Sequence, residues 1–129
     1  MVRKTAAHAQ HLLLDLLVDG PSSFAALFGS LCDRHSYVAT SAMVDATLDA
    51  LTEMTAKGWL RSRTMTATGA FTDTTDSDIW VARSRYREWL PNAAKDERAV
   101  DEIGLWYEIT ESGRDEWTQW SQEIGRAHV

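Results

Sequence analysis

The chain has 129 residues, of which 44% are hydrophobic and 25% are charged. That length and composition suit one globular domain with its own core, and they exclude an intrinsically disordered chain. The formal net charge of -6 disfavours a general electrostatic attraction to nucleic acid or to an anionic lipid surface, although it leaves room for a local basic patch.

Two helices are predicted near the N-terminus. The first covers residues 5–19, where leucines recur with the 3.6-residue period of an amphipathic helix. Gly20-Pro21 ends it, because glycine closes helices and proline cannot continue them. Ser22 or Ser23 then caps a second helix that extends to about Asp33 and buries a stripe of phenylalanine and leucine side chains.

The third helix begins after a loop and ends where a cation and a glycine follow each other. Thr40 or Ser41 caps its start, and Lys57-Gly58 closes it. Beyond it, alternating and turn-forming residues predict two strands, a short charged helix, a third strand and a closing helix capped by Thr110. In chain order these elements lie at residues 59–68, 79–87, 93–103, 105–109 and from 110 onward, with a polar turn at 69–78.

This order of elements is that of a winged helix-turn-helix, and two stretches resemble the PadR-type winged-helix regulators. They are TLDALTEMTAKGWLRSR, which joins a Leu-x-x-Leu run to Gly58 and an apolar pair, and YEITESGRDEW, in which Thr110 begins a Thr-x-x-Gly-Arg helix start. The resemblance implies an α+β, mainly helical fold with three helices, a small antiparallel β-wing and a C-terminal helix. It also implies a DNA-binding transcriptional regulator. Residues 1–129 would form this single domain, with 69–104 as an insertion that enlarges the wing.

The arginines of the predicted wing are regularly spaced. Arg61 and Arg63 alternate on one predicted strand, and Arg83, Arg85 and Arg87 alternate on the next. Period-two spacing puts each set on one strand face, so a hairpin would gather all five into one basic patch suited to phosphate. Residues 59–91 hold five cations and four anions, whereas the flanking parts are acidic. The alternative is that these arginines pair with acids, either in the acidic C-terminal third or nearby at Asp73, Asp76, Asp78 and Glu88.

The third helix carries an acidic side. Asp45, Asp49 and Glu53 recur every four residues and therefore line up on one exposed face. In a DNA-reading winged helix that face would enter the major groove, where phosphates repel carboxylates. The acidic side is thus either a solvated polar face or a binding surface for a basic protein partner.

The six tryptophans are expected to pack mainly in the core. Two of them are also interface candidates. Trp89 stands beside a proline that ends its segment, which favours exposure. Trp120 lies on the closing helix, where it would cover either the first helix or a second subunit.

Two functional interpretations follow. In the first, a regulator binds double-stranded DNA through phosphate contacts from the wing and through the uncharged end of the third helix. Its contact residues are Ser41, Met43, Lys57, Arg61, Arg63, Arg83, Arg85 and Arg87. In the second, the winged helix binds a basic protein partner and no DNA. The interface residues of this second interpretation are Asp45, Asp49, Glu53, Trp89 and Trp120. A homodimer is compatible with either interpretation.

Neither an enzyme nor a cofactor or metal site is predicted. His8, His11 and Asp15 share one side of the first helix, but nothing nearby completes a metal site. The chain has no phosphate loop and no nucleophile elbow. Cys32 lies in an apolar helical pattern and is expected to be a small buried residue rather than a reactive thiol.

The expected location is the cytoplasm. A single cysteine cannot form a disulfide within the chain, which suits a reducing compartment. The N-terminal run MVRKTAAHAQ lacks the apolar core of a signal peptide, and HLLLDLLV is too short and too charged to cross a membrane. We therefore expect no membrane partner.

Overall fold

The computed structural model describes residues 2–35, 40–89 and 104–127 of the chain. No helix in these ranges is long and apolar enough to cross a membrane. The architecture is α+β and mainly helical, as the sequence predicts. In chain order the elements are α1 (Val2–Leu17), β1 (Ser22–Ser23), α2 (Phe24–His35), α3 (Ser41–Ala56), β2 (Leu60–Met65), β3 (Phe71–Asp73), α4 (Asp76–Trp89), β4 (Gly104–Ile109) and α5 (Glu111–Ala127).

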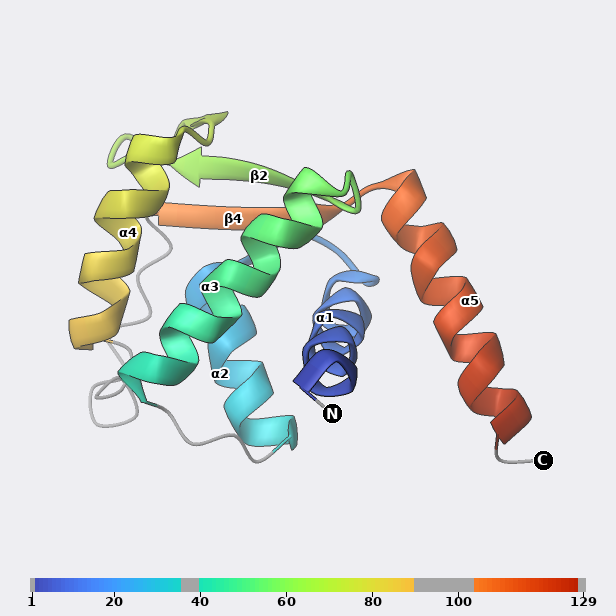
Figure 1. Ribbon diagram of the computed structural model, residues 1–129. Coiled ribbons are helices and arrows are strands. Elements are labelled where there is room, and N and C mark those ends of the chain that lie inside the picture. Colours follow the sequence, from blue (N-terminus) through green and yellow to red (C-terminus); the bar gives the residue numbers. More distant parts are fainter. Residues whose placement is uncertain (1, 36–39, 90–103, 128–129) are drawn as a thin grey trace.

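The strands form one antiparallel sheet in the order β1-β4-β2-β3. Its centre is the pair of β2 and β4, in register from Leu60 opposite Ile109 to Met65 opposite Gly104. Figure 1 shows α1, α2 and α3 beneath one face of this sheet, with α4 and α5 at opposite ends of the molecule. The other face, here called the outer face, is left without a helix in the described part of the chain.

The core lies between the sheet and the first three helices. Side chains on the inner face of β4 alternate with outer ones, so Leu105, Tyr107 and Ile109 are buried while their neighbours are half-exposed. The helices contribute the predicted stripes of apolar residues, since the same period of 3.6 that shaped the sequence pattern turns them toward one side. The helical core residues are Leu12, Leu13, Leu14, Leu17, Phe24, Leu27, Phe28, Leu31, Val44, Leu48, Leu51 and Met54.

The predicted helix ends are confirmed by their hydrogen bonds. Thr40 adopts an extended conformation and its hydroxyl accepts a bond from the Met43 amide at 3.1 Å, which caps α3. Gly58 has a φ of 82°, the left-handed conformation that lets the chain leave the helix sharply. The Thr110 hydroxyl accepts the Gly113 amide at 3.1 Å and so caps α5.

The strand predicted for residues 79–87 is wrong, because this segment is part of α4. Its start is fixed by a reciprocal cap in which the Asp78 carboxylate accepts the Thr75 amide at 2.9 Å and the Thr75 hydroxyl accepts the Asp78 amide at 3.1 Å. Ala82 and Tyr86 then bury one helical stripe against the core. The polar turn predicted at 69–78 also holds a short strand, β3. The charged helix predicted at 93–103 lies outside the described residues.

Candidate functional site: the α3–α4 face and the outer face of the sheet

Helix α4 is anchored to the core beside α3. Tyr86 is only 2% exposed, and its ring stacks on Phe24 with centroids 4.6 Å apart. Its hydroxyl accepts the Leu105 amide at 3.1 Å, which ties α4 to the start of β4. Because both the stacked ring and the hydrogen bond lie inside the fold, α4 is an integral part of the domain.

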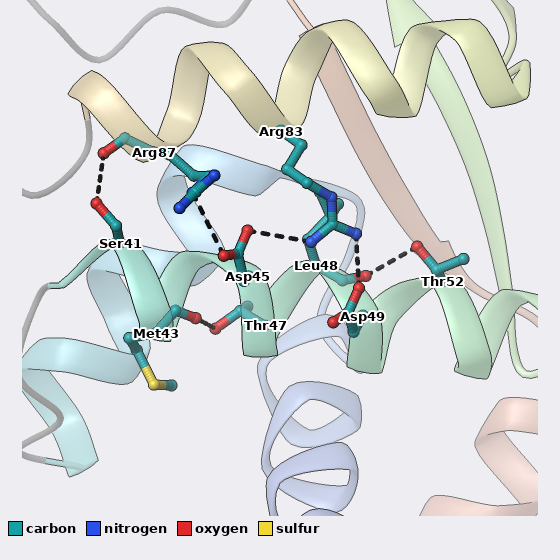
Figure 2. Close-up of polar contacts among 9 residues, drawn as sticks. All are labelled: Ser41, Met43, Asp45, Thr47, Leu48, Asp49, Thr52, Arg83 and Arg87. Atoms are coloured by element: carbon teal, nitrogen blue, oxygen red, sulfur yellow. Dashed lines mark hydrogen bonds and ion pairs between the residues drawn. The ribbon is translucent and has the colours of Figure 1, made fainter.

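The side of α4 that faces α3 carries two arginines, and the facing side of α3 carries two aspartates (Figure 2). The Arg83 guanidinium forks between them, with Nη1 3.1 Å from Asp45 Oδ1 and Nη2 2.6 Å from Asp49 Oδ1. Arg87 Nε lies 3.3 Å from the other oxygen of Asp45. The Arg83 side chain is 29% exposed, so these charge-assisted bonds are partly shielded from water. They raise the pKa of Arg83, with the hydrogen bond to Asp49 as the largest cause.

The two sets of charges that the sequence assigned to rival functions therefore neutralise each other. The expected basic patch of five arginines is not formed, because Arg83, Arg85 and Arg87 lie on a helix and Arg61 and Arg63 on β2. The expected alternative, pairing with acids, is found for at least three of them. Arg61 approaches Asp73, one of the acids expected, at 3.9 Å, whereas the partners of Arg83 and Arg87 are the acids of α3. Asp45 is accordingly only 33% exposed at its side chain.

The remaining candidates for DNA contact, two in α3 and one at its C-cap, also contact other parts of the chain, Met43 by packing against the core. The Ser41 hydroxyl donates to the backbone carbonyl of Arg87 at 2.9 Å. Met43 is half-buried and points away from α4 in Figure 2. The Lys57 ammonium lies 3.1 Å from Gln10 Oε1, 3.4 Å from Glu53 Oε1 and 4.5 Å above the centre of the Trp59 ring.

The outer face of the sheet brings together the other two arginines. Arg61 and Arg63 lie on the side of β2 opposite to the core, next to Glu108 and Trp106 of β4 in the register. Phe71 of β3 packs edge-on against Trp106, with centroids 5.6 Å apart. These residues line a pocket of about 90 Å³. We call it the sheet pocket, lined by Pro21, Arg61, Arg63, Phe71, Trp106, Tyr107 and Glu108.

Neither the family models, nor the curated proteins, nor the solved structures with which the chain was compared match it.

The tryptophans follow the prediction in part. Trp59 and Trp117 pack against the core, although none of the tryptophans with a described side chain is fully buried. Trp80, on α4, is 74% exposed. Trp106 was expected in the core but lies on the outer face of the sheet, since β4 places every second residue there. Sequence alternation in residues 104–109 could have revealed this, because 105, 107 and 109 form the apolar set. Trp89 ends α4, and its side chain is outside the described part.

Trp120 covers the first helix. Its ring stacks on His11 of α1 with centroids 5.4 Å apart, which is the first of the two roles expected for it. His11 also lies 3.0 Å from Glu116 of α5, and Asp15 accepts the Trp117 indole N–H at 3.1 Å. The polar side of α1 therefore docks α5, and the described residues hold no cluster of three groups able to bind a metal ion.

Cys32 is half-buried, and its pKa is raised, first by burial and second by the nearby charge of Asp33. A raised pKa leaves less thiolate at neutral pH, and the thiolate is the reactive form. We expect iodoacetamide to alkylate Cys32 more slowly in the native protein than in urea. The alkylation rate of the native protein should also reach its half-maximum at a higher pH than the rate in urea. Mass spectrometry of timed samples measures the rate and its pH dependence. Equal rates in the native and unfolded protein would contradict the raised pKa of Cys32.

Proposed function

We propose that this protein is a winged-helix domain that binds another protein and does not read double-stranded DNA with its third helix. The layout supports the winged-helix part, since three helices precede an antiparallel pair of strands and a C-terminal helix packs after β4. The ion pairs between Arg83 and the two aspartates of α3 carry the functional part, because they hold α4 along the side of α3 that would face DNA.

The size of the paired helices argues against insertion into DNA. The major groove of B-DNA is about 12 Å wide, which admits one helix of about 10–12 Å diameter. Helices in contact lie with their axes about 8–10 Å apart, so two side by side are about 20 Å wide. An α3 that carries α4 along its flank is therefore too wide for the groove.

The side chains on the exposed surface of α3 also argue against insertion into DNA. The exposed residues of α3 are Ala42, Ala46, Asp49, Thr52, Glu53 and Ala56. The alanines and the two acids have no side-chain donor, and the Thr52 hydroxyl already donates to the Leu48 carbonyl at 2.8 Å. This surface therefore offers a phosphate or a base edge no free side-chain donor. The proposed role is non-catalytic, and it needs only a surface that a partner recognises.

Fluorescence anisotropy with a labelled random-sequence duplex tests this proposal. We expect no saturable binding at low ionic strength, where electrostatic attraction to DNA is strongest. The double variant Arg83→Ala/Arg87→Ala should not bind either, because it leaves the carboxylates of Asp45 and Asp49 without their arginine partners. Binding by the wild type that weakens with salt and is lost in Arg83→Ala/Arg87→Ala, but not in a control Arg114→Ala on α5, would overturn the proposal.

The acidic residues supply a second arm of the same experiment. Changing Asp45 and Asp49 to asparagine removes two negative charges from α3 while it keeps their size. We expect the duplex still to remain unbound, since α4 continues to cover this side. Tight binding gained by Asp45→Asn/Asp49→Asn would mean that charge alone, and not the covering helix, keeps α3 from DNA.

A further inference from the structure

We infer that the sheet pocket on the outer face binds a segment of a partner protein in which a carboxylate stands next to an aromatic side chain. This inference rests on the proposed function, because it names where and how the partner would be recognised. It concerns a face of the molecule formed by β2, β3 and β4, on the side of the sheet away from the three core helices (Figure 1).

The aromatic part of the pocket is already ordered by the sheet. Phe71 is opposite Met65 in the β2–β3 register, and it meets Trp106 at an interplanar angle of 87°. Phe71 is 45% exposed although it is a large apolar side chain. An edge-to-face corner of this kind accepts a further ring or aliphatic group, which gains from the area removed from water.

Arg63 supplies the polar part. Its Nε is buried and has no hydrogen-bond partner among the described residues. A buried donor left without an acceptor costs about 1–3 kcal/mol, and a charged donor costs more. A carboxylate brought into the pocket would pair with the Arg63 guanidinium, and a turn of that side chain would bring the buried Nε to the carboxylate, so part of that cost would be recovered on binding.

Arg61 stands beside it on the same face of β2. Its nearest described acid contact is a 3.9 Å approach to Asp73, whose side chain is 91% exposed. An exposed pair at that distance contributes little and exchanges easily with a ligand. Two guanidinium groups are thus placed on one side of an aromatic corner.

The acids around the pocket favour a protein segment over nucleic acid. Asp73 and Glu108 flank the two arginines, so the face carries two positive and two negative side chains. A polynucleotide presents a phosphate at every residue and would meet both acids. A peptide presents one carboxylate at a chosen position, and its backbone N–H groups can donate to Glu108.

The test uses 3-phenylpropionate, a small molecule that joins a ring to a carboxylate. NMR titration of the full chain follows the Nε–H signals of the arginines and the indole N–H of Trp106. We expect saturable shifts at Arg63 and Trp106. The neutral analogue 3-phenylpropanamide should bind at least tenfold more weakly, and inorganic phosphate and a thymidine dinucleotide should leave Trp106 unshifted. Equal shifts with the amide, or stronger ones with the dinucleotide, would overturn the inference.

Variants make the assignment residue-specific. Arg63→Gln should weaken phenylpropionate binding at least tenfold, and Arg63→Lys, which keeps the charge but lacks Nε, should weaken it clearly as well. Arg114→Gln, at an exposed arginine of α5, should leave it unchanged. Full affinity in Arg63→Lys would overturn the role of Nε. The duplex assay tests the proposed function separately. If the protein binds neither the duplex nor phenylpropionate, the inference about the sheet pocket is wrong, whereas the proposal that α3 does not read DNA is retained.

Discussion

Replacing Tyr86 with alanine should lower the free energy of unfolding by about 3–5 kcal/mol, the range for truncating a buried aromatic side chain. The substitution removes a ring that is 2% exposed and stacked on Phe24. It also leaves the buried Leu105 amide without the hydroxyl that accepts it. Urea unfolding followed by tryptophan fluorescence measures the loss.

The variant Tyr86→Phe separates the two contributions. It keeps the ring and deletes only the acceptor, so about 1–3 kcal/mol should be lost. Hydrogen exchange in Tyr86→Ala should also rise along α4 more than along α1, because the anchor of α4 is gone. A loss below about 1 kcal/mol in Tyr86→Ala would mean that α4 is not part of the core, and it would weaken the argument that α4 blocks α3.

Replacing Gly113 with alanine should destabilise the protein by about 3 kcal/mol, at the upper end of the overpacking range. Glycine to alanine inside a helix ordinarily stabilises by about 0.5–1 kcal/mol, so the sign is reversed here. The sign is reversed because Gly113 lies where α5 packs closely against the segment that follows α3. A Cβ on Gly113 would overlap the backbone carbonyl of Trp59 and crowd Ile109.

That carbonyl cannot simply move away. It accepts the Thr110 amide at 2.9 Å, and the Thr110 hydroxyl donates to the Gly58 carbonyl at 2.6 Å. The matched control is Gly29→Ala in α2, where an added Cβ meets nothing within 4 Å. Thermal unfolding of both variants should show Gly29→Ala unchanged or slightly stabilised. Equal melting temperatures for the two variants would contradict the packing argument.

The local sequence was enough for the helix ends and for the central strands. Thr40 and Thr110 carry hydroxyls at helix starts, and Gly58 tolerates the left-handed conformation that closes α3. These signals depend on interactions within a few residues, so they can be read without the fold. The alternation of residues 104–109 also marks which side of β4 is buried, although the expectation of Trp106 in the core did not follow it.

The sequence by itself did not decide the conformation of residues 79–87. Their arginines alternate as in a strand, while Ile79, Ala82 and Tyr86 recur as in a helix, and both periods are present in the same letters. The cap between Thr75 and Asp78 is the local signal that favoured the helix, and burial of Tyr86 against Phe24 completed the choice.

Only the tertiary structure decided what the charged residues do. Arg83 meets Asp45 and Asp49 across 38 and 34 positions of the chain, and no spacing rule connects residues that far apart. The acidic helix and the arginine run each look like a binding surface when read alone. Packing α4 against α3 joined them in one intramolecular ion-pair cluster, whereas Arg61 and Arg63, on β2, lie on the outer face of the sheet. Charge along a sequence determines what a surface can attract, whereas the fold determines which charges remain at the surface.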